Sequence, residues 1–193
     1  MVRRLLGSAT TNSSGVGTLT YTGTGKGKLR IVAVSDGVES AEYDLYDCKF
    51  YDRGTSNSST WTSTSNITYT GGSDYATLQA TNSANTGLMY QTITSSYSVF
   101  EFDYNANVNV VFCSLRDGAT SITSISSEYL GSPTVDTWHH LRIEVNGTGY
   151  RAIIDGVAKD WKTMTGSQTF NRFYFGFTGG NGLILKYKNF MAW

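Results

Sequence analysis

The segment that decides the fold is "WHHLRIEVNGTGYRAIIDG", residues 138–156. In "HLRIEV" the apolar side chains of Leu141, Ile143 and Val145 fall on one face of an extended chain, and polar side chains fall on the other. "NGTG" contains an Asn-Gly pair typical of a tight turn, "YRAII" supplies a returning strand, and "DG" turns the chain again. The segment therefore predicts two successive hairpins of an antiparallel sheet.

The same segment holds both histidines of the chain, His139 and His140. Neighbouring residues on a strand point to opposite faces, so a regular strand prevents the two rings from holding one metal ion. We expect His139 to be a strand-entry residue. His140 then shares the outward face with Arg142 and Glu144.

Composition extends the β interpretation to the whole chain. The 193 residues include 21 glycines, one proline and 13% aromatic residues, together with many Ser, Thr and Asn residues. This mixture favours short strands joined by tight turns. No segment of helical length carries an apolar stripe with helical spacing. The sequence predicts an all-β protein.

Charge excludes some classes of partner. Fifteen basic and fifteen acidic residues give a formal net charge of zero, and 16% of the chain is charged. We therefore expect no nucleic-acid binding and no membrane insertion, but a neutral, polar ligand. The start of the chain, "MVRRLLGSAT", has too short an apolar run for a signal peptide. A protein that works outside the cell then leaves by another route, or the chain is an excised fragment.

Strand-like segments separated by Asn/Ser/Gly turns continue in both directions from the two hairpins. About eleven strands in this part of the chain imply two stacked sheets. The predicted strands are residues 46–51, 66–70, 75–80, 87–93, 97–104, 108–115, 122–130, 138–145, 149–154, 170–178 and 182–192. Residues 53–65 are predicted to be a polar loop, in which Trp61 is either an anchor on the core or an exposed platform for a ligand.

Two patterns in this region resemble laminin G-like and concanavalin A-like jelly rolls. One is the order tryptophan, histidine, two alternating apolar residues, glycine and a final Asp-Gly. It is filled here by Trp138, His139, Leu141, Ile143, Gly149, Asp155 and Gly156. The other is "FNRFYFGFTGGNGLILKYKNFMAW", which is similar to the last two strands of that fold. The resemblance covers residues 47–193 and implies a two-sheet sandwich.

The preceding segment has a different pattern. "YTGTGKGKLRIVAVSDGVES", residues 21–40, resembles the closing half of a bacterial immunoglobulin-like domain of the kind found in surface adhesins. A complete sandwich of that type needs about seven strands in about 100 residues, and this piece supplies about three. We therefore expect residues 1–46 to form a partial domain that is completed by the following domain or by a neighbouring chain.

Some concanavalin A-like relatives are glycosidases, and the resemblance implies that their activity requires an E-x-D-x-x-E arrangement. The nearest match is "VFEFDYNAN", in which Glu101 and Asp103 point to the same face but position 106 is Ala. Retaining hydrolysis needs two carboxyl groups about 5–5.5 Å apart, and no other Glu lies nearby in the sequence. We therefore predict no enzyme. Glu101 and Asp103 can still hydrogen-bond a sugar.

No cofactor is predicted. Calcium is common in relatives of this fold, but the chain has no D-x-[DN]-x-[DN]-G loop, so its binding stays open and no ligands are assigned. Cys48 and Cys113 lie in strand-like segments and lack CxxC spacing. Buried free thiols are favoured over a disulfide.

The leading hypothesis is a non-catalytic recognition module. A jelly roll preceded by part of an immunoglobulin-like domain resembles adhesins and the tail-fibre receptor-binding proteins of tailed viruses, including archaeal ones. That resemblance implies a cell-surface polysaccharide or glycoprotein as partner and a place on a virion or an extracellular surface. A virion protein, which is released by lysis, needs no signal peptide.

Candidate ligand contacts are polar side chains on the outward faces of the predicted strands, with two tryptophans as aromatic candidates. They are Glu101, Asp103, Arg116, His140, Arg142, Arg151, Tyr174, Trp61 and Trp161. Solvated residues in cross-strand pairs are the alternative interpretation. The second hypothesis is a structural virion or fibre module that assembles with copies of itself, for example as a trimer. A glycoside hydrolase is the third.

Overall fold

The computed structural model describes residues 7–14, 16–19, 27–41, 43–48, 50–54, 61–81, 87–109, 111–166, 169–177 and 182–193. The chain divides into two compact units, Met1–Cys48 and Lys49–Trp193. Each unit is described by itself. The division into an immunoglobulin-like segment, 1–46, and a jelly roll, 47–193, stays a prediction.

The N-terminal unit contains two small antiparallel sheets. Strand β1 (Gly27–Ile31) pairs with β4 (Tyr43–Asp47), and β2 (Val34–Ser35) pairs with β3 (Val38–Glu39). The turn between β2 and β3 is Asp36-Gly37, with φ of 51° and 78°. Two successive positive φ angles are what a tight hairpin turn requires, which is the reason for a glycine at the second position. Residues 20–26, the start of the immunoglobulin-like pattern, lie outside the described residues.

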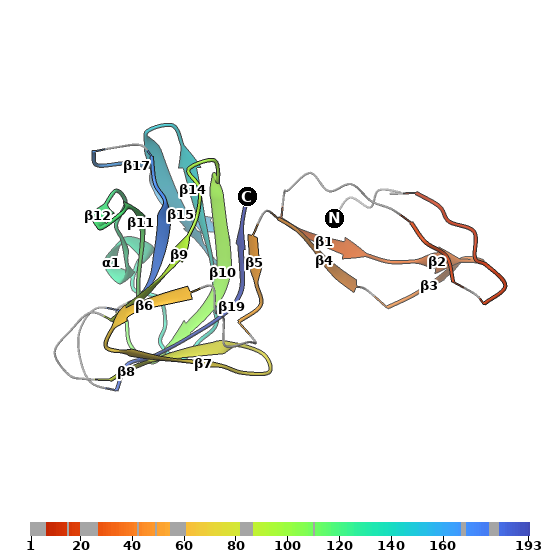
Figure 1. The fold of residues 1–193 in the computed structure, drawn as a ribbon, viewed down its shortest axis with the longest axis horizontal. Helices are drawn as coiled ribbons and strands as arrows, with labels where there is room; N and C mark the ends of the chain where they lie inside the picture. Colours follow the sequence, from red (N-terminus) through yellow and green to blue (C-terminus); the bar gives the residue numbers. More distant parts are fainter. Residues whose placement is uncertain are drawn as a thin grey trace. The chain divides into compact units, whose positions relative to one another are not determined.

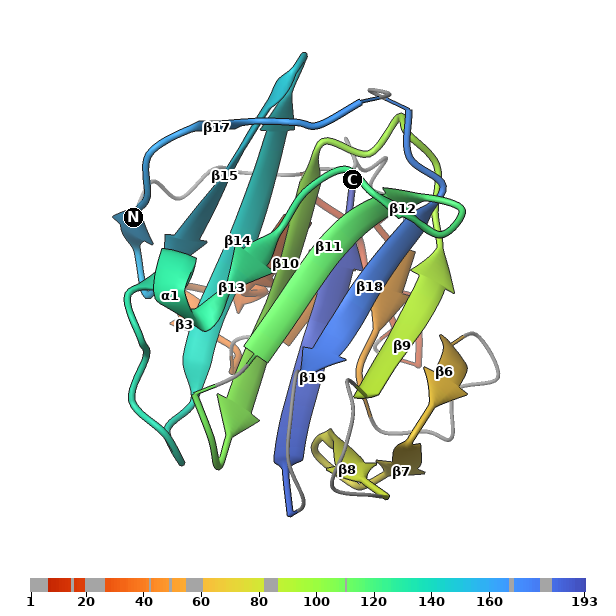
Figure 2. The same cartoon turned by 90° about the vertical axis from the view of Figure 1, so that its left-hand side faces the viewer.

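The C-terminal unit is a sandwich of two antiparallel sheets (Figures 1 and 2). In the larger sheet the order is β16-β15-β14-β10-β19-β8-β7, with β17 beside β15 and β5 beside β19. In the smaller sheet it is β12-β11-β18-β9-β6, with β13 beside β11. The predicted all-β, two-sheet sandwich is confirmed.

The bounds of the strands follow. The larger sheet contains β5 (Phe50–Asp52), β7 (Ile67–Gly71), β8 (Ala76–Ala80), β10 (Val99–Ala106), β14 (His139–Asn146), β15 (Gly149–Ile154), β16 (Val157–Ala158), β17 (Lys162–Thr163) and β19 (Ile184–Ala192). The smaller sheet contains β6 (Trp61–Ser65), β9 (Gly87–Thr92), β11 (Val111–Asp117), β12 (Thr120–Ser121), β13 (Ile125–Ser126) and β18 (Arg172–Phe177).

The two hairpins predicted after Trp138 are present. Strands β14 and β15 pair from Leu141 opposite Ile154 to Asn146 opposite Gly149. The chain then turns at Asp155 and Gly156, both with positive φ, and returns as β16. The local pattern of apolar residues and turn residues thus specifies this part of the sheet.

The core lies between the inner faces of the two sheets and is rich in phenylalanine. Phe102 on β10 contacts Phe175 on β18 and Phe190 on β19, with ring centroids 4.7 and 5.7 Å apart. Phe100 stacks on Phe173, with centroids 5.3 Å apart. Such aromatic pairs hold facing sheets together by burying large apolar rings in favourable mutual orientations.

Three sequence-based element assignments are wrong. Residues 46–51 are not one strand, because β4 ends at Asp47 in the N-terminal unit and β5 begins at Phe50 in the C-terminal unit. Residues 61–65 form β6, not part of a loop, because Trp61 packs into the core and draws this segment into the smaller sheet. Residues 122–130 are not one strand: β13 is followed by a short helix, α1 (Ser127–Leu130). The Ser126 side chain accepts a hydrogen bond from the Tyr129 backbone N–H and thereby caps this helix, which ends at Gly131 with φ of 86°.

A glycine at position 176 is required by close backbone contact. A Cβ atom there would lie 2.0 Å from the Gly87 carbonyl oxygen on the neighbouring strand β9. We predict that Gly176→Ala lowers the free energy of unfolding by about 1–3 kcal/mol, because β9 and β18 must move apart to accept the methyl group. Urea denaturation measures the loss. Thr92→Ala, an exposed change on the same sheet, serves as control, and equal stability of the two variants would contradict the prediction.

Candidate functional site

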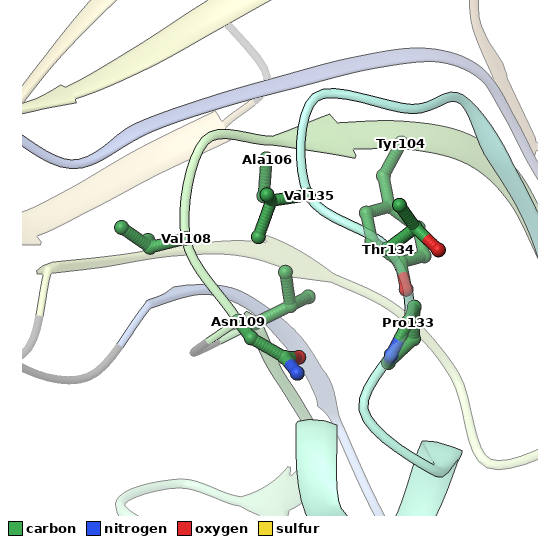
Figure 3. A pocket seen from close by; sticks show the side chains of 8 residues that line it. Tyr104, Ala106, Val108, Asn109, Pro133, Thr134 and Val135 are labelled. Carbon is green, nitrogen blue, oxygen red and sulfur yellow. The ribbon is translucent and has the colours of Figure 1, made fainter.

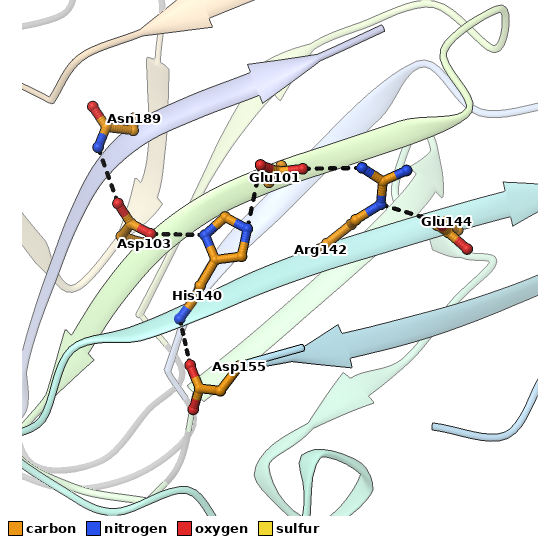
Figure 4. A network of polar contacts seen from close by, with 7 residues as sticks. All are labelled: Glu101, Asp103, His140, Arg142, Glu144, Asp155 and Asn189. Carbon is orange, nitrogen blue, oxygen red and sulfur yellow. Dashed lines mark hydrogen bonds and ion pairs between the residues drawn. The ribbon is translucent and has the colours of Figure 1, made fainter. Parts of the chain in front are cut away.

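Six charged side chains form a network on the outer face of the larger sheet, the face that points away from the core; Figure 4 shows all of them except Arg151. They are Glu101, Asp103, His140, Arg142, Glu144 and Arg151, and we call this set the charged network. Five of them lie on the adjacent strands β10 and β14, and Arg151 lies on β15. The set unites five of the predicted contacts with Glu144.

His140 is the centre of one half of the network. Its Nδ1 lies 2.8 Å from Asp103 Oδ1, and its Nε2 lies 3.2 Å from Glu101 Oε1. The strand register brings them together, because Asp103 is directly opposite His140. Asp103 also accepts a hydrogen bond of 3.0 Å from Asn189 Nδ2. The register between β10 and β19 shifts at a bulge between Glu101 and Asp103. A bulge can redirect a side chain, here that of Asn189 toward Asp103.

Arg142 and Arg151 form the other half. Arg142 Nη1 lies 3.2 Å from Glu101 Oε2, and its Nε donates to Glu144 Oε1 at 2.9 Å. Arg151 Nη2 lies 2.7 Å from Glu144 Oε2. Acidic and basic groups therefore alternate across three strands, and each holds its neighbours in place.

The pKa values follow from these contacts. Hydrogen bonds to Asp103 and Glu101 raise the pKa of His140 to about 9, although burial of the ring acts the other way. Burial alone would raise the pKa values of Glu101 and Asp103, but favourable contacts outweigh it. They come from His140 and Arg142 for Glu101, and from His140, Asn189 and Lys188 for Asp103. Both carboxyl pKa values lie below their ordinary values. At neutral pH the centre is an imidazolium between two carboxylates.

His139 points to the opposite face and is buried. Its Nδ1 lies 2.6 Å from Asp155 Oδ2, and its Nε2 lies 2.8 Å from the Thr134 carbonyl oxygen. The other Asp155 oxygen accepts a 2.9 Å hydrogen bond from the His140 backbone N–H. The prediction that the two histidines face opposite ways is confirmed. Among the described residues no group of three or more His, Cys, Asp or Glu side chains is arranged to hold a metal ion.

Beside the network the outer face carries a group that the sequence-based site prediction missed. Trp138 and Tyr75 lie with ring centroids 5.7 Å apart. Lys188 Nζ is 4.4 Å from the Trp138 ring, and Lys186 Nζ is 5.3 Å from the Tyr75 ring. We call these four residues the aromatic end. The sequence could have placed Trp138 on this face, because residues two apart on a strand share a face and His140 points outward. It could not have placed Tyr75 there, because Tyr75 lies far away in the sequence.

Arg116 and Tyr174, predicted as ligand contacts together with the residues of the network, do not lie on this face. They lie on β11 and β18 of the smaller sheet. There the Arg116 guanidinium lies 4.2 Å from the centre of the Tyr174 ring, which stacks on Tyr90. The core separates the outer faces of the two sheets, and the sequence pattern of a single strand does not show to which sheet it belongs.

Trp61 is a core anchor and not a ligand platform. It is only 9% exposed, and its ring lies 5.1 Å from Phe190 and 5.7 Å from Tyr187. Its indole N–H donates a hydrogen bond to the Asp52 carboxylate. Trp161, in contrast, is 45% exposed, and the Arg151 guanidinium lies 4.9 Å from its ring. Trp161 therefore flanks the charged network at the β15 side.

The cysteines and one small recess lie outside the site. Cys48 and Cys113 are not joined by a disulfide, and Cys113 is buried while Cys48 is half-buried. The recess, shown in Figure 3, is lined by Tyr104, Ala106, Val108, Asn109, Val111, Pro133, Thr134 and Val135. It has room for about one water molecule and not for a sugar ring.

The residue at position 106 is relevant to hydrolysis of a glycosidic bond. The glycosidase pattern requires a second Glu there, but Ala106 is buried and belongs to the hydrophobic core. Along the alternating strand, Glu101 and Asp103 point outward and residue 106 points inward. The chain has no carboxyl group at the position of the second catalytic glutamate.

Comparisons with solved structures show the same fold at low sequence identity. A sialidase matches with a TM-score of 0.58 and 12% identity over 69% of this chain, which spans 17% of the sialidase chain. A protein of unknown function with a galectin-like fold from Bacillus subtilis matches with a TM-score of 0.54 and 10% identity, covering 75% of this chain and 94% of that one. A β-glucanase from Bacillus licheniformis matches with a TM-score of 0.51 and 12% identity, covering 74% of this chain and 96% of that one.

No protein-family model and no curated protein sequence matches the chain. At identities of 10–12% the structural likeness establishes the jelly-roll sandwich and nothing about activity. In the described part of the chain, no helix is long and apolar enough to cross a membrane.

The different surroundings of Trp61 and Trp161 lead to a stability prediction. We expect Trp61→Ala to lower the free energy of unfolding by about 3–5 kcal/mol, because it empties a core site and leaves the Asp52 carboxylate without its indole partner. Trp161→Ala, at an exposed edge, is expected to change it by less than about 1 kcal/mol. Chemical denaturation of both variants checks this, and similar losses would show that the core assignment of Trp61 is wrong.

The charged network leads to a pH prediction. The pKa of His140 is raised from 6.5 to about 9, so its stabilising contribution is complete below pH 6.5 and is lost as pH rises through about 9. Glu101 and Asp103 have lowered pKa values, so their contribution is present above ordinary carboxyl pKa values and is lost in acid. NMR titration of the His140 ring measures its pKa directly.

Asp103→Asn supplies the control for that titration. It removes the largest cause of the raised pKa, the hydrogen bond to the Asp103 carboxylate. The pKa of His140 should fall in this variant. A wild-type pKa near the ordinary value of 6.5, unchanged in Asp103→Asn, would rule out the network as described.

Proposed function

We propose that the C-terminal unit is a non-catalytic saccharide-recognition module and that the outer face of its larger sheet is the binding surface. One observation carries the proposal: a fixed array of polar groups shares one sheet face with an aromatic pair, Trp138 and Tyr75, of which Trp138 is exposed. Sugars present apolar C–H faces and hydroxyl groups side by side. A surface that offers rings and polar groups together matches both.

The aromatic end supplies the apolar contact. Trp138 is 37% exposed, although large aromatic side chains are mostly buried. A sugar ring stacked on it lies next to Asp103, His140 and Asn189, since Lys188 joins the two groups on β19. Carboxylate oxygens accept hydrogen bonds from sugar hydroxyls, and guanidinium N–H groups donate them.

The charged network supplies polar contacts that are already ordered. Each side chain is held by at least one neighbour, so binding does not have to freeze long, mobile side chains. Preorganisation of this kind lowers the entropic cost of association. A weakly folded loop surface would lack this advantage.

The same contacts argue against hydrolysis. A glycosidase keeps one carboxylic acid protonated by raising its pKa, so that it can protonate the leaving group. Here the pKa values of Glu101, Asp103 and Glu144 all lie below their ordinary values. The carboxylates are held as ion-pair partners, which suits binding and does not suit acid catalysis.

We extend the proposal to the biological partner, a cell-surface polysaccharide or glycoprotein met by an adhesin or a viral tail-fibre protein on a virion or an extracellular surface. The support is the resemblance of residues 21–40 and 138–156 to the two domain types that such proteins combine. Calcium stays without an assigned site.

One observation favours the second candidate, a structural module that assembles with copies of itself. Among the described residues of the N-terminal unit, the sheets have two strands each, β1 with β4 and β2 with β3. Two-stranded sheets are marginal in water and leave edges open for pairing with another chain. Light scattering separates the candidates: a monomer that binds glycans supports recognition, and a trimer without glycan binding supports assembly.

The proposed function predicts the effect of removing the exposed ring. Trp138→Ala should weaken binding to a saccharide identified on a glycan array by at least about tenfold, because the stacking surface is lost. Trp138→Phe should keep most of the affinity. Affinity electrophoresis or calorimetry measures both.

Val157→Ala, at an exposed position on the edge strand β16, is the control and should bind like the wild type. Circular dichroism verifies that the variants are folded. If the wild-type protein bound no saccharide on an array and no cell surface, the proposed function would be wrong.

A further inference from the structure

The charged network is balanced within itself. Its three carboxylates are those of Glu101, Asp103 and Glu144, and its three cations are those of His140, Arg142 and Arg151. Every cation lies within 3.2 Å of a carboxylate oxygen of the same set. The network therefore gives the outer face no net charge at neutral pH.

Lys186 and Lys188 add two positive charges beside this balanced set. They lie two residues apart on β19, so they share the outer face. Within the described part of the chain neither forms an ion pair with a carboxylate. Lys186 lies near the ring of Tyr75 and Lys188 near that of Trp138, and the positive charge of Lys188 also helps to lower the pKa of Asp103. Lys186 lies opposite the neutral Asn105.

The carboxylate nearest in register, that of Asp103, is shared between Lys188 and the charged network. Asp103 lies opposite Lys188, but its Oδ1 accepts from His140 at 2.8 Å and its Oδ2 accepts from Asn189 at 3.0 Å. Both oxygens are therefore engaged by other donors. Two ammonium groups remain in surplus at the aromatic end.

These ammonium groups are placed where a bound sugar would meet them. A sugar ring stacked on the exposed face of Trp138 brings its ring substituents close to the Lys188 Nζ, which lies 4.4 Å from the ring centre. A carboxylate on that sugar gains a charge-assisted hydrogen bond, stronger than one from a neutral hydroxyl. A hydroxyl substituent leaves both lysines without a counter-charge.

We propose that the aromatic end selects an acidic saccharide, a sugar chain that carries carboxylate groups, such as a polyuronate. This inference rests on the proposed function and names the class of ligand. It departs from the neutral ligand expected from the zero net charge of the chain, because a sum over the whole sequence does not show how charge is distributed on one face.

The test compares polymers that differ only in charge. Polygalacturonate and its methyl-esterified form share one backbone; alginate and hyaluronan extend the acidic set, and a glucan and a galactan extend the neutral set. We expect at least one acidic polymer to bind about tenfold more tightly than its neutral counterpart, with affinity falling as salt is raised. Calorimetry at low and physiological ionic strength measures this.

The double variant Lys186→Gln/Lys188→Gln should lose about tenfold in affinity for the acidic polymer and should lose its salt dependence. Lys162→Gln is the matched control, since the Lys162 ammonium also lies over a ring, that of Tyr129 at 4.1 Å, but on β17 and outside the aromatic end. It removes one positive charge and should leave binding unchanged.

Each other outcome identifies which proposal fails. Equal binding of neutral and acidic polymers, still lost in Trp138→Ala, would overturn the acidic preference and keep saccharide recognition. Equal losses in Lys162→Gln, or equal binding of poly-glutamate, would reduce the effect to non-specific charge attraction and overturn the inference. No binding to any saccharide would overturn both proposals.

Discussion

The pairing register of β10 with β14 is the constraint on which the rest of the site depends. It sets Asp103 opposite His140 and Glu101 opposite Arg142. A shift by one residue would turn the fully buried Phe100 and Leu141 outward and the charged side chains into the core. The apolar core therefore specifies the arrangement of the polar groups, although the core rings lie on the opposite face of the sheet.

The charged network itself adds little to the stability of the fold. Its members are partly exposed, and exposed ion pairs contribute about 0–1 kcal/mol each. Holding six long polar side chains in one arrangement is thus poorly explained by stability alone. It is better explained by recognition, where ordered donors and acceptors reduce the entropy lost on binding.

Local features were predictable from the sequence, and features that depend on distant pairing were not. The hairpins, the opposite faces of His139 and His140, and the shared face of Glu101 and Asp103 follow from a side-chain period of two. The sheet to which Arg116 and Tyr174 belong depends on how β11 and β18 pair, which no single segment records. Tyr75 meets Trp138 only because β8, β19, β10 and β14 are neighbours in the sheet.

The outer face of the smaller sheet shows by contrast why the larger sheet is the better candidate. Arg116 lies directly opposite Arg172, a like-charge pair that is unfavourable by itself. Their guanidinium groups lie 4.2 Å from the Tyr174 ring and 4.6 Å from the Tyr90 ring, and these two rings stack on each other. Cation–π contacts of this kind offset the repulsion and use the ring faces.

Tyr174 is consequently only 5% exposed, whereas Trp138 is 37% exposed. On the smaller sheet the faces of Tyr174 and Tyr90 are occupied by contacts within the protein. Tyr174 therefore offers no open ring face to a sugar. On the larger sheet Lys188 also lies over the Trp138 ring, at 4.4 Å, but Trp138 keeps 37% of its surface exposed. An aromatic surface that remains open beside ordered polar groups is what distinguishes a binding face from a self-contained one.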